Sequence, residues 1–161
     1  MERGASASDE TACIDEPLDI IEEMNRQFDD AIITTDVGQH MMLVSQYAEI
    51  TEKKQLVMSG GLGTMGYGFP AAIGAQIGNP EKRVIAVSGD GGMQMNIQEF
   101  ATAVLEETPV IACVFNNTYL GMVRQWQKLF YGKRYGMTNL RAGALSRRTD
   151  GAEFPEYTPD L

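Results

Sequence analysis

Four short apolar runs divide the chain, and each one ends in glycines or small polar residues. The runs are rich in β-branched residues and have no polar face, which is typical of strands buried on both sides of a parallel sheet. They cover residues 31–37, 55–58, 83–88 and 110–115. Helical stretches separate them, so the pattern predicts an α/β fold: a doubly wound parallel sheet with helices on both faces.

Helical spacing marks the segments before and between these runs. Between residues 17 and 29, apolar residues recur at intervals of three and four, which predicts an amphipathic helix. A second helix, rich in alanine and glycine, is expected from Met65 to Ile77. A third is expected after residue 96, because Asn96 precedes Glu99 by three residues as in a capping box.

Three regions are expected along the chain. Residues 1–14 are small, polar and without periodicity, and are interpreted as a flexible tail. Residues 15–135 are predicted to form one α/β domain. Residues 136–161 contain no clear strand and are interpreted as an irregular C-terminal segment of the same domain, whose last strands are expected to be missing.

Composition narrows the classes of partner. The 161 residues include 13 basic and 22 acidic side chains, giving a net charge of −9. Such a chain repels phosphate backbones, so nucleic acids and anionic membranes are poor partners. The two cysteines lack metal-ligand spacing, and no apolar stretch approaches the roughly 20 residues of a membrane span. We therefore expect a cytoplasmic protein.

Chemistry is expected at the carboxyl ends of the strands, where open parallel sheets bind ligands. Asp90 and Asn117 follow neighbouring runs, and their oxygens suit Mg²⁺. The backbone amides of Gly91 and Gly92 are placed to bind phosphate oxygens, so an acidic chain can hold a diphosphate without a basic patch. The alternative is that Asp90 and Asn117 only close turns and cap helices.

A second alternative is a dinucleotide-binding domain. The spacing Gly61-x-Gly63-x-x-Gly66 matches the Rossmann fingerprint, and Asp90 lies at the end of the next run. A redox domain gives no reason, however, for the pair Asn116-Asn117.

The combination of Gly89-Asp90-Gly91 with Asn116-Asn117 resembles the motif of enzymes that use thiamine diphosphate. Segments 59–75, 95–103 and 119–127 are similar to the catalytic large subunit of acetolactate synthase, also called acetohydroxyacid synthase. The resemblance covers roughly residues 17–135. It corresponds to the C-terminal, diphosphate-binding domain of that subunit and implies the thiamine-diphosphate-binding fold.

The resemblance implies two cofactors, thiamine diphosphate and Mg²⁺. The implied metal ligands are Asp90, Asn117 and the main-chain carbonyl of Tyr119. The residues implied in binding thiamine diphosphate are Gln39, His40, Gly63, Met65, Gly89, Gly91, Gly92, Asn117 and Met122.

Particular roles follow from the same resemblance. Gln39 and His40 would close over the diphosphate, and Met65 would support the bent conformation of the cofactor. Met122 and Trp126 lie four residues apart on one helical face and would border the substrate pocket, where Trp126 would select the second oxoacid. Without the resemblance, His40 is equally well a structural histidine, Met65 a core filler and Trp126 a packing anchor.

Two positions depart from the family pattern. Family members commonly have serine where this chain has Gly92, which removes one hydroxyl group from the diphosphate site. They also commonly have Gln-Met-Trp after the histidine, where this chain has Met41-Met42-Leu43.

The implied reaction decarboxylates pyruvate and condenses the product with a second pyruvate or with 2-oxobutyrate, in branched-chain amino-acid biosynthesis. The partners implied are these oxoacids, the pyrimidine-binding domain of a neighbouring subunit and further copies of the chain. That domain, with its activating glutamate, and the FAD domain of the family have no counterpart here, so the isolated chain is expected to be inactive. The alternatives are an inert fragment that binds no cofactor, and another thiamine-diphosphate decarboxylase or carboligase.

Overall fold

The computed structural model describes residues 17–140 of the chain. The chain divides into two compact units, Met1–Asn117 and Thr118–Leu161, and each is described by itself. The predicted tail at residues 1–14 lies outside the described residues, as does most of the segment 136–161.

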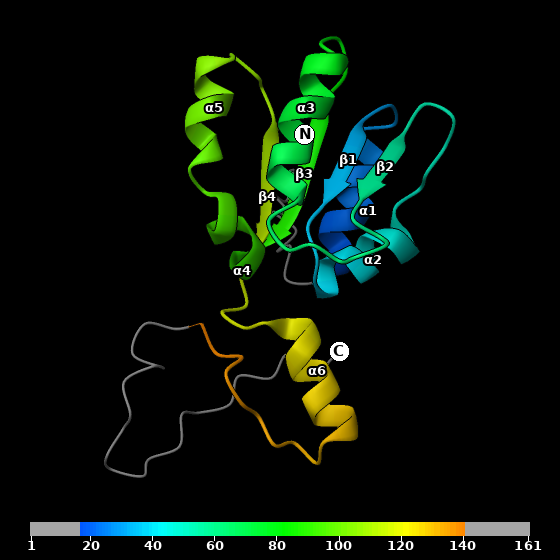
Figure 1. Ribbon diagram of the computed structural model, residues 1–161. Coiled ribbons are helices and arrows are strands. Elements are labelled where there is room, and N and C mark those ends of the chain that lie inside the picture. The colour runs from blue at the N-terminus through cyan, green and yellow to red at the C-terminus, as the bar shows by residue number, and fades with distance from the viewer. Residues whose placement is uncertain (1–16, 141–161) are drawn as a thin grey trace, which may run out of the picture. The chain divides into compact units, whose positions relative to one another are not determined.

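The first unit is built on a four-stranded sheet (Figure 1). Its strands are β1 (Ile32–Thr35), β2 (Gln55–Met58), β3 (Val84–Gly89) and β4 (Ile111–Phe115). All neighbouring pairs are parallel, and the order across the sheet is β2-β1-β3-β4. The predicted parallel α/β fold is confirmed, and each observed strand lies within about one or two residues of its predicted bounds.

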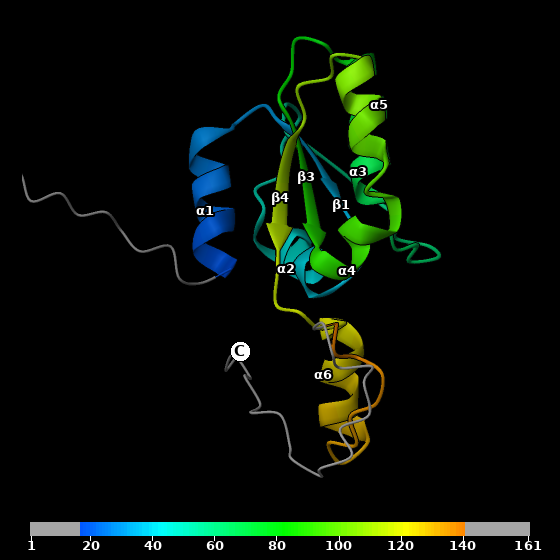
Figure 2. The same cartoon turned by 90° about the vertical axis from the view of Figure 1, so that its left-hand side faces the viewer.

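Helices cover both faces of this sheet (Figure 2). One face carries α1 (Pro17–Gln27) and α2 (Gln39–Tyr47), and the other carries α3 (Gly68–Gly78), α4 (Asp90–Met93) and α5 (Glu99–Leu105). A short 3₁₀ helix, η1 (Gln94–Asn96), links α4 to α5. The apolar periodicity of residues 17–29 predicts α1 nearly to its end, whereas α2 was not predicted.

The sheet has one apolar core on each face, because side chains along its strands alternate between the two faces. In β1, Ile32 packs with the α3 side and Ile33 with the α1 side, because successive side chains of a strand point to opposite faces. In β3, Val84 and Ala86 join the first core, and Ile85 joins the second. The helices are therefore fixed on the sheet by side chains of its two central strands.

The expectation that all four strands are buried on both faces is only half correct. Every residue of β1 is buried, as is nearly all of β3. In β2 and β4 no residue is buried, and Ile111 and Val114 are exposed. Within residues 17–140, β2 and β4 form the two edges of the sheet, where one side of each strand lacks a neighbour.

Two predicted helix starts are wrong. Helix α3 begins at Gly68 rather than Met65, because Gly66 has a φ of +87°, which is incompatible with a right-handed helix. The capping box at Asn96 is absent: α5 begins at Glu99 and makes no side-chain cap bond at Gln98. The Asn96 amide instead donates a hydrogen bond of 2.7 Å to the carbonyl of Gly66.

In its described part, the second unit consists of helix α6 (Gly121–Phe130) and the segment that follows it. Residues 138–140 return beside residues 118–120, through an antiparallel bridge between Tyr119 and Asn139. The Arg124 guanidinium lies 4.5 Å from the ring centroid of Tyr119 and 3.9 Å from that of Tyr135. Across residues 17–140, no helix is both long and apolar enough to cross a membrane.

Candidate functional site

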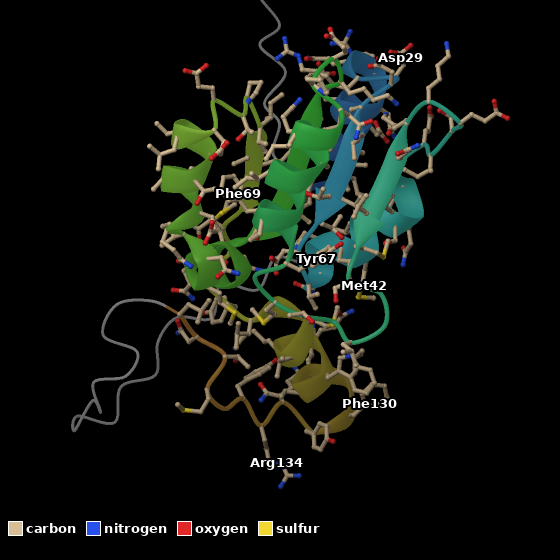
Figure 3. All side chains as sticks on the ribbon, turned by 45° about the horizontal axis from the view of Figure 1, so that its top comes forward. Asp29, Met42, Tyr67, Phe69, Phe130 and Arg134 are labelled. Carbon is tan, nitrogen blue, oxygen red and sulfur yellow. The ribbon has the colours of Figure 1, made fainter. Side chains whose placement is uncertain are left out.

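The strand order singles out one place on the sheet edge. From β1 the chain moves outward to β2, then crosses back over β1 to form β3 on its other side. The carboxyl ends of β1 and β3 therefore mark the point at which the winding direction reverses, which is where open α/β sheets bind ligands. Tyr67 and Met42 lie at this end of the sheet in Figure 3, and Asp29 lies at the opposite end.

Asp36 follows β1 and is a central polar group that was missing from the predicted site. Its side chain is only 1% exposed. Its Oδ1 accepts hydrogen bonds from the amides of Val37 (2.8 Å) and Gly66 (3.0 Å), and its Oδ2 accepts one from Gly68 (3.0 Å). Since a buried carboxylate is tolerated only when paired, these amides explain how Asp36 is held at the end of β1.

His40 lies at the start of α2 and packs over the ends of two other strands. Its ring stacks on Phe115 with centroids 6.5 Å apart. The ring also packs against two glycines: a Cβ on Gly38 would clash with His40 Cε1 at 2.6 Å, and a Cβ on Gly89 would make a tight contact with it at 3.1 Å. These contacts place the imidazole at the carboxyl ends of β3 and β4.

The protonation of His40 is set by burial. Burial lowers the pKa of His40, and this outweighs the attraction of the Asp36 charge and a hydrogen bond to the Asp36 backbone. Nε2 of the ring is buried and has no partner among the described residues. An unpaired buried nitrogen at this edge is the kind of group that a ligand satisfies.

The turn after β3 brings Asp90 and three glycines together. Helix α4 begins at Asp90, Gly89 caps it with extended backbone, and Gly91 and Gly92 are buried in its first turn. A Cβ on Gly92 would lie 2.3 Å from Asp36 Oδ1 and 3.1 Å from Ser88 Oγ. The serine expected here from the family therefore has no room beside Asp36 unless one of them shifts.

Asn117 follows β4, the neighbour of β3. Gly89 pairs with Phe115 in the register of these strands, so Asp90 and Asn117 leave the sheet at the same edge. Asn116 and Asn117 are exposed, whereas Asp90 is half-buried. Residues 17–140 contain no cluster of three or more His, Cys, Asp or Glu side chains suited to a metal, so a cation here needs amide or main-chain oxygens beside the Asp90 carboxylate.

The glycine-rich loop after β2 carries Gly63 and Met65. The loop closes on itself, since the Gly63 amide donates to the Ser59 carbonyl and the Thr64 amide donates to Ser59 Oγ. Gly63 has a φ of +61°, which favours glycine. Met65 is half-buried and directly precedes Gly66, which Asp36 binds. This loop follows an edge strand rather than a central one, which does not favour the dinucleotide alternative.

Tyr119, Met122 and Trp126 belong to the second unit. Tyr119 is buried there beneath Arg124. Met122 and Trp126 line one hollow of about 540 Å³, together with Val123, Gln127, Tyr131 and Arg134. The predicted shared face of Met122 and Trp126 on α6 is thus confirmed. The Trp126 ring lies 5.1 Å from that of Phe130 and is 57% exposed, so it is not a buried packing anchor within this unit.

The first unit thus brings several predicted site residues to one sheet edge. Gln39 is the first residue of α2, next to His40, and the turn 89–92 follows β3 beside them. Sequence reasoning missed Asp36 and assigned Asn96 to a helix cap. A signal for Asp36 did exist, because a carboxylate inside an otherwise apolar run has to find buried partners.

Comparison with known proteins gives a consistent result. Residues 36–153 match the family described as "Thiamine pyrophosphate enzyme, C-terminal TPP binding domain". The acetolactate synthase large subunit of Porphyra purpurea is 48% identical over 128 residues, which are 80% of this chain and 22% of that protein. The acetolactate synthase isozyme 3 large subunit of Escherichia coli (strain K12) is 47% identical over 113 residues, 70% of this chain and 20% of that protein. The chain spans about a fifth of the length of these curated relatives.

Proposed function

Because the chain belongs to the family of thiamine pyrophosphate enzymes through their C-terminal TPP-binding domain, we propose that it forms the Mg²⁺ and thiamine-diphosphate site of an acetolactate synthase large subunit. The observation that carries this proposal is the meeting of Asp36, His40 and the Asp90 turn where the winding of the sheet reverses. The unpaired Nε2 of His40 supports a ligand at that edge, and the glycines at positions 38, 89 and 92 let the His40 and Asp36 side chains pack against the backbone there.

In this proposal Asp90, Asn117 and the main-chain carbonyl of Tyr119 hold Mg²⁺, which prefers hard oxygen ligands. Gly89, Gly91 and Gly92 present backbone to the diphosphate, because the first amides of a helix have no partner within it. When bound, thiamine diphosphate supplies the electron sink for decarboxylation of an oxoacid.

The remaining roles concern how the cofactor is covered and oriented. Gln39 and His40 close over the diphosphate. Because Nε2 of His40 has no partner within residues 17–140, Nδ1 is the nitrogen that bonds the Asp36 backbone. A neutral imidazole has one N–H, so Nε2 can donate to the diphosphate only when the ring is protonated. Gly63 shapes the loop that carries Met65, and Met65 supports the bent cofactor. Met122 and Trp126 border the space for the substrate.

For the whole enzyme we propose conversion of pyruvate, with a second pyruvate or 2-oxobutyrate, to the precursors of branched-chain amino acids. This activity requires a pyrimidine-binding domain with its glutamate, supplied by a neighbouring subunit, and FAD belongs to a further domain of the family. We propose a cytoplasmic homo-oligomer. The alternative is that the 161-residue chain alone is an inert fragment.

Calorimetric titration of the purified chain with thiamine diphosphate, with and without Mg²⁺, tests the proposal. Wild-type protein is expected to bind only with Mg²⁺, and Asp90→Ala is expected to abolish binding. Asp30→Ala is the matched control, because it makes the same change in charge at an exposed residue before β1, at the opposite end of the sheet. Undiminished binding by Asp90→Ala would refute the assigned metal site. No binding by a folded wild-type chain would favour the inert fragment.

A further inference from the structure

Two polar side chains bind the same glycine from opposite directions. Gly66 lies between Met65 and the start of α3. Its amide donates a hydrogen bond of 3.0 Å to Asp36 Oδ1, and its carbonyl accepts one of 2.7 Å from Asn96 Nδ2. Asp36 comes from the end of β1 and Asn96 from η1, so three segments distant in the sequence meet at one residue, Gly66, whose two flanking peptide groups are both bonded.

Asp36 also binds the loop at a second point. Its Oδ2 accepts a hydrogen bond of 3.0 Å from the amide of Gly68. Bonds between an ionised carboxylate and backbone amides are shorter and stronger than bonds between neutral groups. Because Asp36 is only 1% exposed, water competes little for them. Asp36 therefore fixes the backbone at two points: at Gly66, directly after Met65, and at Gly68, the first residue of α3.

Close packing reinforces these bonds. A Cβ on Gly66 would lie 2.8 Å from Asn96 Nδ2 and 3.2 Å from Met95 Cβ, and Gly66 has a φ of +87°, which side chains disfavour. A Cβ on Gly68 would lie 2.6 Å from the Asp36 backbone nitrogen. The loop can approach β1 and η1 this closely only because both positions are glycine. We call Asp36, Gly66, Gly68 and Asn96 the Gly66 clamp.

We propose that Asp36 and Asn96 are positioning residues, which act through the Gly66 clamp to fix the backbone that presents Met65 to thiamine diphosphate. This rests on the proposed function, in which Met65 supports the bent cofactor. The tip of the same loop makes no comparable contact: Leu62 is 95% exposed, and no atom within 4 Å would meet a Cβ on Gly61. Apart from the clamp, the loop is held by the short turn that closes on Ser59 and by the packing of the half-buried Met65 itself.

Two isosteric substitutions test the clamp. Asp36→Asn replaces one accepting oxygen by an NH₂ group that faces a backbone N–H. Asn96→Asp replaces the donating NH₂ group by an oxygen, so that two acceptors face each other at the Gly66 carbonyl. The matched control is Asn79→Asp, because Asn79 Nδ2 makes the same kind of bond, 3.1 Å long, to the Ala75 carbonyl at the far end of α3. If an isosteric variant does not fold, Asn96→Ala replaces it in the test, because Asn96 is only half-buried.

The first readout uses the chain without cofactor. The methyl resonance of Met65 in ¹³C-methionine-labelled protein, assigned with Met65→Leu, is expected to shift or broaden in both clamp variants and to stay unchanged in Asn79→Asp. Amide exchange of Gly66 and Gly68 is expected to accelerate in Asp36→Asn. A Met65 resonance at its wild-type position in every clamp variant would overturn the proposal.

The second readout is the affinity for thiamine diphosphate with Mg²⁺. Outer residues that orient binding groups typically change affinity by about 10- to 100-fold, and a loss in that range is expected for each clamp variant. The double variant should lose less than the product of the two single losses, since both residues act on Gly66. Lower stability with wild-type affinity would show a merely structural role and overturn the proposal. If wild-type protein binds no thiamine diphosphate, the proposed function fails, and the Met65 resonance still decides whether the clamp exists.

Discussion

Replacing Gly68 with alanine is expected to loosen the contact between α3 and β1. The added Cβ would lie 2.6 Å from the backbone nitrogen of Asp36, 3.0 Å from its Cα and 3.0 Å from the carbonyl carbon of Thr35. These are backbone atoms at the end of a central buried strand, so they cannot rotate away as a side chain could. Overpacking of this kind costs about 1–3 kcal/mol.

Moving α3 away also weakens two hydrogen bonds. The Gly68 amide donates to Asp36 Oδ2 at 3.0 Å, and its carbonyl accepts from Thr34 Oγ1 at 2.8 Å. A hydrogen bond contributes about 1 kcal/mol net, and more when one partner is charged. With partial loss of both, Gly68→Ala is expected to lower the free energy of unfolding by about 2–4 kcal/mol.

Urea unfolding followed by far-ultraviolet circular dichroism measures this loss, and Gly74→Ala is the matched control. Gly74 lies in the middle of the same helix, and no atom lies within 4 Å of a Cβ built there. Alanine is therefore expected to stabilise the protein at Gly74 by about 0.5–1 kcal/mol, because glycine loses more backbone entropy in a helix. If Gly68→Ala were as stable as Gly74→Ala, the close approach of α3 to β1 would not exist in solution.

Two further predictions concern buried basic side chains. His40 is the only histidine of the chain, and burial lowers its pKa from 6.5, so below about pH 6.5 the unfolded chain binds a proton that the folded protein resists. The free energy of unfolding is then expected to fall as the pH drops from 7 to 5.5, by at most about 1.4 kcal/mol per pH unit. Urea unfolding at several pH values measures this, and the expectation fails if the free energy of unfolding of His40→Gln changes with pH as steeply as that of the wild type. Lys54 is 1% exposed, and its Nζ donates hydrogen bonds to the Met24 carbonyl (3.4 Å) and to Asn25 Oδ1 (3.2 Å). Both acceptors also accept a backbone amide, from Phe28 and Glu49 respectively, so neither is left without a partner when the ammonium group is removed. Lys54→Met is therefore expected to unfold within about 1 kcal/mol of wild type, whereas Lys54→Ala leaves a cavity and loses about 2–4 kcal/mol; equal losses in the two variants would show that the ammonium bonds dominate.

The sequence predicts the burial of the central strands better than that of the edge strands. The runs at β1 and β3 are apolar because the sheet covers both sides of each strand and helices cover both faces. The runs at β2 and β4 have similar composition, yet their residues are less buried. Which strand becomes an edge depends on pairing between distant segments, and local periodicity carries no information about that order.

The candidate site shows the same division between local and distant information. Asp90 and Asn117 were predicted at the sheet edge because each follows a strand, which is a local property, and the structure places both there. The role of Asp36 was not predicted, because two of the three amides that bind it belong to Gly66 and Gly68, which lie beyond β2. Asn96 was assigned to a cap by its spacing to Glu99, but the nearby Gly66 carbonyl is the acceptor that it binds. In both cases the partner comes from a loop that only the folded sheet brings into reach.

The placement of Asp36 bears on how an acidic chain can hold a diphosphate. The net charge is −9, and Asp36 and Asp90 lie at the edge where the diphosphate is proposed to bind. The Asp36 carboxylate accepts hydrogen bonds from three backbone amides, but its charge remains close to Gly92. Free diphosphate approaching this edge would meet both carboxylates, and the burial of Asp36 strengthens its share of the repulsion, because charges interact more strongly in low-dielectric surroundings. A divalent cation held by Asp90, as proposed, would reverse the sign of that interaction, because the ion would become the largest local charge. The same geometry therefore predicts that the metal complex, and not the free cofactor, is the species that binds.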